Sequence, residues 1–291
     1  MKNEIDRRSF RKKALRVGGP PIALPGIADK VRGAELKTGK PLAAARSVDP
    51  LKLPTGTIKH LEISRLICGG NSIGGWAHRR DLMCVSPLIK AYHADEKIFQ
   101  ILRRAEQRVV NTVLTNPSSS RVLKAYRDER GGRCDKFVRD VKIGEIESRL
   151  KFLQKERVPH RLGAHSLETV KPCVKAGFRP DCWVKTLHQD KCWSAPPAKN
   201  RGLLDEVAGG RSEHERHHDN LWCENAPDTI AFRAKLKRAW IAFKGLAAGA
   251  THPRQAFQWA FERGADFICV GMFDFQIVEN AALAQRALAA V

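Results

Sequence analysis

Residues 267–272 read Phe-Ile-Cys-Val-Gly-Met, a short apolar run that contains β-branched residues and has a glycine, Gly271, next to its end. A helical pattern follows over 276–290, and another precedes the run over 253–263, where Gly264 supplies a typical helix C-cap. A run this short between two longer helical patterns is typical of a buried strand. The sequence therefore predicts a buried strand between two helices at this end of the chain.

The same alternation extends back to residue 65. Predicted core strands cover 65–70, 109–115, 137–142, 161–165, 181–187, 240–246 and 267–272, after a short leading strand at 57–61. Predicted helices cover 94–107, 118–129, 145–156, 167–176, 228–238, 253–263 and 276–290. Strands that alternate with helices predict an α/β fold with a parallel sheet and crossover helices.

The strand count predicts an incomplete (β/α)8 barrel of the TIM type. The pattern supplies seven core strands, whereas a closed barrel of this kind has eight. Between Lys142 and Arg161 there is room for a single helix, so we expect one β/α unit to be missing near 143–160. A chain of 291 residues, 43% of them hydrophobic, suffices for one such domain, expected over 56–291.

The N-terminal residues are predicted to lie outside the barrel. Residues 6–12 read Asp-Arg-Arg-Ser-Phe-Arg-Lys, which is similar to a bacterial twin-arginine export signal, although prolines interrupt the apolar stretch that follows. The sequence leaves two interpretations of residues 1–34: an export signal leading to the periplasm, or a basic tail on a cytoplasmic protein. Residues 35–55 are rich in Lys, Pro, Gly and Ala and are expected to be a linker.

The formal net charge of +21 predicts attraction to polyanions or anionic surfaces. The basic residues do not interleave with aromatic residues, and no nucleic-acid motif is present, so no specific nucleic-acid partner is expected. No apolar run reaches the length of about 18 residues that a membrane span needs. The eight cysteines form no C-x-x-C pair, which argues against a zinc ribbon. The oligomeric state is left open.

Several segments, taken in order, resemble the aldo/keto reductases, a family of NAD(P)-linked oxidoreductases with a TIM barrel fold. They are residues 64–70, 162–166, 240–249 and 267–272, followed by Gln276, Glu279 and Asn280. The resemblance implies that a nicotinamide cofactor would contact Ser166, Gly271, Gln276, Glu279 and Asn280. Residues 165–169, 185–190 and 271–276 also resemble an uncharacterised family of exported bacterial barrel proteins, which implies no particular activity.

The catalytic residues of the aldo/keto reductases are mostly not matched. Carbonyl reduction in that family needs a tyrosine acid, a lysine, an aspartate and a histidine. Asn111 stands where the resemblance places the aspartate, residues 114–121 contain no tyrosine, and the strand that carries the histidine is the missing one. Lys142 matches the lysine, while Phe273 replaces the arginine with which many members bind a phosphate. We therefore expect no standard carbonyl reduction.

Other chemistry is expected at the C-terminal ends of the strands, where barrels of this class carry their active sites. The candidate catalytic residues are His165, His188, Asp190, Lys142, Lys185 and Lys244. The candidate metal ligands are His165, His188, Asp190 and His217, a mixed set that suits zinc, iron or manganese.

Three interpretations of function remain open from the sequence. The first is an exported, metal-assisted enzyme that acts on a small sugar-like substrate. The second is a non-catalytic ligand-binding or degenerate barrel. The third is an NAD(P)-dependent oxidoreductase, for which the cofactor residues named above would be retained.

Overall fold

The computed structural model describes residues 53–77, 84–131, 136–137, 155, 159–189, 223 and 225–291. All of them belong to one compact unit, Asp49–Val291. The predicted signal and nearly all of the predicted linker lie outside the described residues. Within the described ranges, no helix combines the length and the hydrophobicity needed to cross a membrane.

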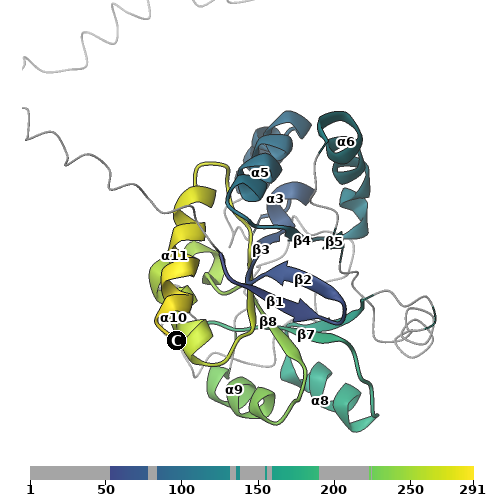
Figure 1. Cartoon of the computed structure of the whole chain (residues 1–291), viewed down its shortest axis with the longest axis vertical. Helices are drawn as coiled ribbons and strands as arrows, with labels where there is room; N and C mark the ends of the chain where they lie inside the picture. Colours follow the sequence, from purple (N-terminus) through teal and green to yellow (C-terminus); the bar gives the residue numbers. More distant parts are fainter. Residues whose placement is uncertain are drawn as a thin grey trace, which may run out of the picture. The chain divides into compact units, whose positions relative to one another are not determined.

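The first element is an antiparallel hairpin of β1 (Thr55–Ile58) and β2 (Leu61–Ser64). The sequence predicted a single strand over 57–61 here, and this was wrong because Lys59 and His60 form the turn. Ile58 and Ile63 of the hairpin are buried in one cluster with Phe267, the first residue of a core strand, and Ile241, the middle residue of the neighbouring strand. The hairpin therefore packs against the N-terminal side of the sheet, and Figure 1 shows it lying over the strands.

Seven strands form the main sheet, and all of their ladders are parallel. They are β3 (Leu66–Gly69), β4 (Thr112–Leu114), β5 (Lys136–Phe137), β6 (Arg161–Ala164), β7 (Cys182–Thr186), β8 (Ala239–Phe243) and β9 (Phe267–Val270). The α/β class and the parallel sheet predicted from the alternating pattern are confirmed.

Within the described residues, the strand order is that of an incomplete barrel, with a gap between its two edge strands. It runs β5-β4-β3-β9-β8-β7-β6, so the last strand pairs with the first core strand, with Ile67 opposite Cys269. This pairing is what closes a (β/α) barrel. Within the described residues β5 and β6 are the two edges, and the stretch between them contains the predicted missing unit near 143–160, most of which lies outside the described residues.

Helices follow most of the strands. They are α3 (Asn71–Gly74), α4 (Val85–Tyr92) and α5 (Asp95–Gln107) after β3, α6 (Ser120–Arg130) after β4, α8 (Leu167–Lys175) after β6, α9 (Ala226–Ala234) before β8, α10 (Pro253–Glu262) after β8 and α11 (Ile277–Ala289) after β9. Short 3-10 turns lie at Pro117–Ser119 and Ala247–Gly249. The sequence missed α3 and α4.

Successive side chains of each strand point to opposite faces of the sheet. Trp183 and Trp240 pack with Leu167 and Val170 of α8, so they mark the outer, helix-covered face. Val184 and Ile241, one residue further along, pack with residues of the hairpin and the other strands and mark the inner face. The outer face of β3 and β9 is covered in the same way by α5, α10 and α11 (Figure 1).

Candidate functional site

Three neighbouring strands bring a histidine, a threonine and a phenylalanine together at their C-terminal ends. His165 follows β6, Thr186 ends β7 and Phe243 ends β8, with Thr186 and Phe243 paired in register. The Nδ1 atom of His165 lies 2.9 Å from Oγ1 of Thr186. The imidazole ring lies 5.7 Å from the ring of Phe243, at an interplanar angle of 33°. The half-buried His165 is thus fixed at the inner, C-terminal end of the sheet.

His188 lies two residues beyond β7 and is almost fully buried. Its Nε2 accepts a hydrogen bond from the backbone N–H of Cys223 at 2.8 Å, and its Nδ1 lies 2.7 Å from the carbonyl oxygen of Gln189. Because Nε2 is the acceptor, Nδ1 carries the proton and donates to that carbonyl. The ring therefore ties the end of β7 to the residues that precede α9.

The two candidate lysines of this region lie differently. Lys185, a candidate catalytic residue from the sequence, follows Trp183 by two residues and so lies on the outer, helix-covered face of β7. It is buried, and its Nζ donates to the carbonyl oxygen of Thr186 at 2.9 Å. Lys244 directly follows β8 with a positive φ of 58°, and its Nζ lies 5.7 Å from the ring centre of Phe243. Both lysines thus contact a residue of the His165 group, Lys185 through the Thr186 backbone and Lys244 through the Phe243 ring.

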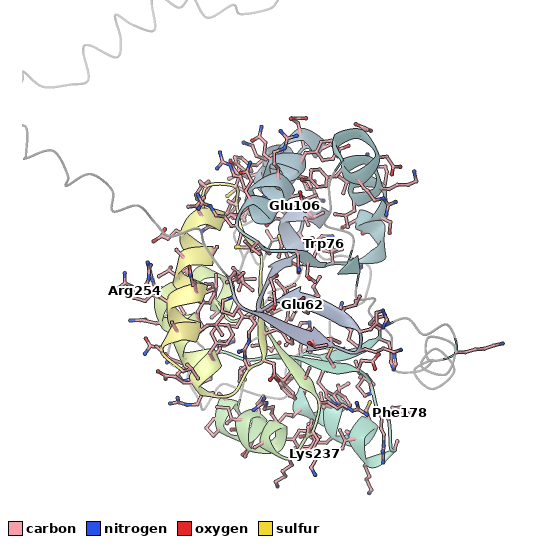
Figure 2. The ribbon with its side chains drawn as sticks, viewed as in Figure 1. Glu62, Trp76, Glu106, Phe178, Lys237 and Arg254 are labelled. Carbon is pink, nitrogen blue, oxygen red and sulfur yellow. The ribbon has the colours of Figure 1, made fainter. Side chains whose placement is uncertain are left out.

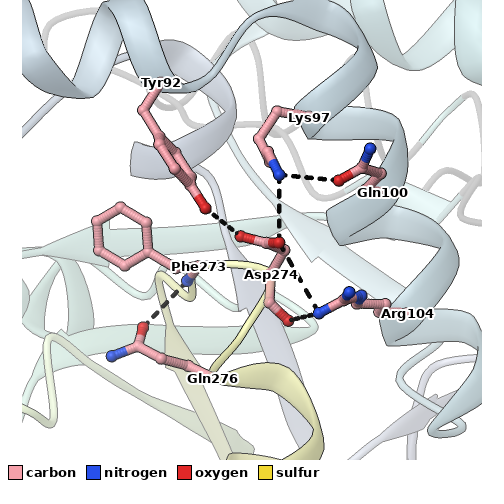
Figure 3. Close-up of polar contacts among 7 residues, drawn as sticks. All are labelled: Tyr92, Lys97, Gln100, Arg104, Phe273, Asp274 and Gln276. Atoms are coloured by element: carbon pink, nitrogen blue, oxygen red, sulfur yellow. Dashed lines mark hydrogen bonds and ion pairs between the residues drawn. The ribbon is translucent and has the colours of Figure 1, made fainter.

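A second polar group surrounds Asp274, just beyond β9 (Figure 3). The Asp274 carboxylate accepts a hydrogen bond from the Tyr92 hydroxyl at 2.5 Å and one from Lys97 Nζ at 3.3 Å. Arg104 lies 3.8 Å from the carboxylate and donates to the Asp274 carbonyl oxygen at 2.9 Å. Residues of α4 and α5 are thus tied to the loop between β9 and α11.

These contacts determine the charge of Asp274. Burial raises its pKa, but hydrogen bonds from Tyr92 and Lys97, with the positive charges of Lys97 and Arg104, outweigh burial and hold the pKa below its usual value. The hydrogen bond to Asp274, reinforced by burial and by the negative carboxylate, raises the pKa of Tyr92. A tyrosine in this setting holds its proton more tightly, which makes it a poor proton donor for catalysis.

His93 completes the Asp274 group. Burial lowers the pKa of its imidazole, and its Nδ1 lies 2.9 Å from the carbonyl oxygen of Ile89. Its ring packs 5.2 Å from Phe273, which in turn stacks at 5.3 Å on the exposed Phe275. His93 Nε2 is buried, and no described residue forms a hydrogen bond with it.

The residues implied to contact a nicotinamide cofactor lie in two places. Ser166 caps α8, since its hydroxyl accepts from the N–H of Glu168, and Gln276 accepts from the N–H of Phe273 at 3.0 Å. Gly271 and Glu279 are exposed. Asn280 is buried, and its Nδ2 has no hydrogen-bond partner within the described ranges. Of the five, Asn280 thus carries a donor that a ligand could satisfy.

Asn111 does not stand at a catalytic position. The resemblance placed it at the end of a strand over 109–115, but β4 begins at Thr112, after Asn111. Its Oδ1 accepts from the backbone N–H of Ser64 at 2.9 Å, and its Nδ2 donates to the carbonyl oxygen of Glu62. Asn111 therefore holds the hairpin to the N-terminal end of the sheet, opposite His165.

The fit to a metal ion is poor in the part of the chain that the structure describes. No group of three or more His, Cys, Asp or Glu side chains there could hold a metal. Both ring nitrogens of His188 are engaged with the backbone, so a metal would have to displace the Cys223 N–H. Asp190, His217 and Lys142 lie outside the described residues, so their predicted roles stay predictions.

The sequence missed the partners of Asp274 and of His165. Tyr92, Lys97 and Arg104 are more than 160 residues from Asp274, and Thr186 was not singled out. One signal was available: Lys97 and Arg104 are seven residues apart, so they share one face of α5.

No protein-family model matches the chain, and no curated protein matches it. Two solved structures from Pseudomonas aeruginosa, both provisionally assigned as aldo-keto reductases, are similar to it. The first shares 16% identity at a TM-score of 0.48, covering 84% of this chain and 99% of that one. The second shares 17% identity at a TM-score of 0.46, covering 82% of this chain and 96% of that one.

Proposed function

We propose that the chain is a barrel protein that binds a small polar, sugar-like ligand at the C-terminal ends of its strands. The observation that carries this proposal is His165, held by Thr186 and Phe243 at the inner ends of three adjacent strands. Barrels of this class bind their ligands at this end. An imidazole can exchange hydrogen bonds with sugar hydroxyls, and a phenyl ring can pack against the apolar face of a sugar.

The proposal does not include carbonyl reduction by the aldo/keto reductase route. Asn111 is a structural residue at the opposite end of the sheet. Tyr92, the tyrosine nearest to a charged group in the described ranges, has its pKa raised by a carboxylate, whereas an acid catalyst needs a lowered one. Should the protein be an enzyme, His165 is the group best placed to move a proton.

His165→Ala is expected to weaken ligand binding at least about tenfold, because it removes one directional hydrogen-bonding group of about 1.4 kcal/mol. The measurement is ligand-observed NMR titration of the full chain with a panel of aldopentoses and aldohexoses. Thr186→Val should give a smaller loss, since the imidazole then keeps its place against Phe243 but loses one orienting contact.

The matched control is His60→Ala, which removes an exposed histidine from the hairpin turn at the other end of the sheet. It should bind every panel member as the unaltered chain does. If His165→Ala bound a sugar with the same affinity as the parent chain, the ligand would have to bind elsewhere, and the proposal would be wrong.

One observation favours NAD(P) binding as a second candidate function. The buried Nδ2 of Asn280, in α11, has no hydrogen-bond partner among the described residues. The resemblance implies that Asn280 contacts the adenosine half of the cofactor. A buried donor without an acceptor costs about 1–3 kcal/mol, which a bound ligand would recover. Phe273, in place of an arginine, argues for weak binding of the phosphorylated cofactor.

Asn280→Ala is therefore expected to lower the affinity for NADH by about tenfold in a fluorescence titration, because the Nδ2 donor is lost. Gln255→Ala, which removes an exposed amide side chain from the neighbouring helix α10, serves as the matched comparison. If NADH at millimolar concentration does not quench the fluorescence of the unaltered protein, this second candidate function is rejected. The sugar-binding proposal then still stands.

A further inference from the structure

The N-terminal ends of β7 and β8 carry a group of exposed basic residues. Lys175 is the last residue of α8, and Arg179 lies between α8 and β7. Lys235, Lys237 and Arg238 lie between α9 and β8. These five residues are called the basic face below. Because parallel strands begin at one end of the sheet, the basic face lies at the end opposite His165 and does not belong to the proposed ligand site.

Packing beneath these residues brings them together. Val174 and Phe178 from the end of α8, and Phe232 and Leu236 from the end of α9, join one apolar cluster with Trp183 and Trp240. Cys182 also pairs with Ala239 in the sheet, so the residues just before each strand are neighbours. Figure 2 labels Phe178 and Lys237 at the same lower rim of the view.

No described acidic residue balances the positive charge of the basic face. None of its five side chains forms an ion pair with a described residue. The nearby acidic side chains already form ion pairs with other basic residues. Asp181 pairs with His160 and Lys59, Asp266 pairs with Arg233, and Glu262 pairs with Arg263.

We propose that the basic face docks on a bilayer surface that carries anionic lipids. Long basic side chains around half-buried apolar ones, here Phe178 and Leu236, suit a membrane interface, which accepts both charge and hydrocarbon. A nucleic acid is a poorer fit, because the face offers neither an exposed aromatic platform nor a helix directed into a groove. The net charge of +21 adds long-range attraction to the same surface.

The test compares two triple variants of the full chain by co-sedimentation with vesicles. Lys235→Glu, Lys237→Glu and Arg238→Glu reverse the basic face. Arg103→Glu, Arg254→Glu and Arg286→Glu make the same charge change at exposed sites on α5, α10 and α11. The vesicles contain phosphatidylcholine with roughly 30 mol % phosphatidylglycerol, which gives a strongly anionic surface. Loss of three basic residues, at roughly fivefold each, weakens partitioning about a hundredfold. The first variant should lose more than this, because its three added carboxylates also repel the surface.

The control variant should lose clearly less, and pure phosphatidylcholine vesicles should bind none of the chains. A set in which Lys235, Lys237 and Arg238 become Gln should lie between the parent and the Glu variant, which separates lost attraction from misfolding. Equal losses in both Glu variants would assign binding to bulk charge and overturn the proposal. The proposal would also be overturned if the chain bound duplex DNA through the basic face at an ionic strength at which it did not bind anionic vesicles.

Discussion

Gly70→Ala is expected to destabilise the barrel by about 3 kcal/mol or more, the largest effect of any single change considered. Gly70 follows β3, and an ideal Cβ atom on it would lie 2.5 Å from Cα of Thr115, just beyond β4. That neighbour is backbone and cannot rotate away. The φ of Gly70 is −81°, which alanine adopts freely, so the whole cost is steric overlap between two adjoining strand ends.

Urea unfolding followed by circular dichroism would measure this loss, and a domain of this size should also lose about 10 °C in Tm. Gly177→Ala is the comparison, since Gly177 has a φ of 79° and no atom within 4 Å of its ideal Cβ. That variant should cost about 1 kcal/mol through backbone strain alone. If the two variants lose the same small amount, β3 and β4 do not approach each other as closely as described.

Asp274→Ala is expected to lower the free energy of unfolding by about 2 kcal/mol. The substitution leaves the Tyr92 hydroxyl and the Lys97 and Arg104 cations without their carboxylate, and Asp274 itself is buried. The loss stays below the cost of a fully buried pair because Arg104 is almost half exposed. Asp128→Ala, which removes the exposed partner of Lys124, should change stability by less than about 0.5 kcal/mol.

The effect of Asp274→Ala should also depend on pH. The folded pKa of Asp274 is depressed below its ordinary value of 3.8, so its stabilising contribution is fully present above that value. The contribution is then lost as the pH falls through the folded pKa. The difference in free energy of unfolding between the parent chain and Asp274→Ala should therefore be the same at pH 7 and pH 5. This difference should decrease below about pH 4. A difference that grows as the pH falls would contradict the claim that Asp274 is ionised in the folded protein.

Much of the fold was predictable because most core strands are apolar runs between clear helix signals. Strands β6, β8 and β9 lie within two residues of the predicted bounds at their starts and within three at their ends. The predicted strand over 109–115 was too long, since Val109 has a φ of 62° and belongs to the turn after α5. A β-branched residue in that conformation is rare, so no local pattern indicates it.

The hairpin turn was missed for a related reason. Lys59 has a φ of 55°, and the turn contains no glycine, asparagine or aspartate, the residues that usually mark a two-residue turn. For the site, the sequence singled out His165 but not the Thr186 and Phe243 contacts that fix it. Those contacts depend on the register between strands, which side-chain periodicity along one strand does not contain.

The ladder between β3 and β9 has a consequence for the order in which the molecule is made. It joins Ile67 to Cys269, about 200 residues apart, whereas the other described ladders join strands that follow one another in the chain. During translation β6, β7 and β8 can pair as they emerge, but one side of β3 has to wait for almost the whole chain. A ribosome stalled before Phe267 would therefore hold a nascent chain with an open strand edge, which is a natural target for chaperones.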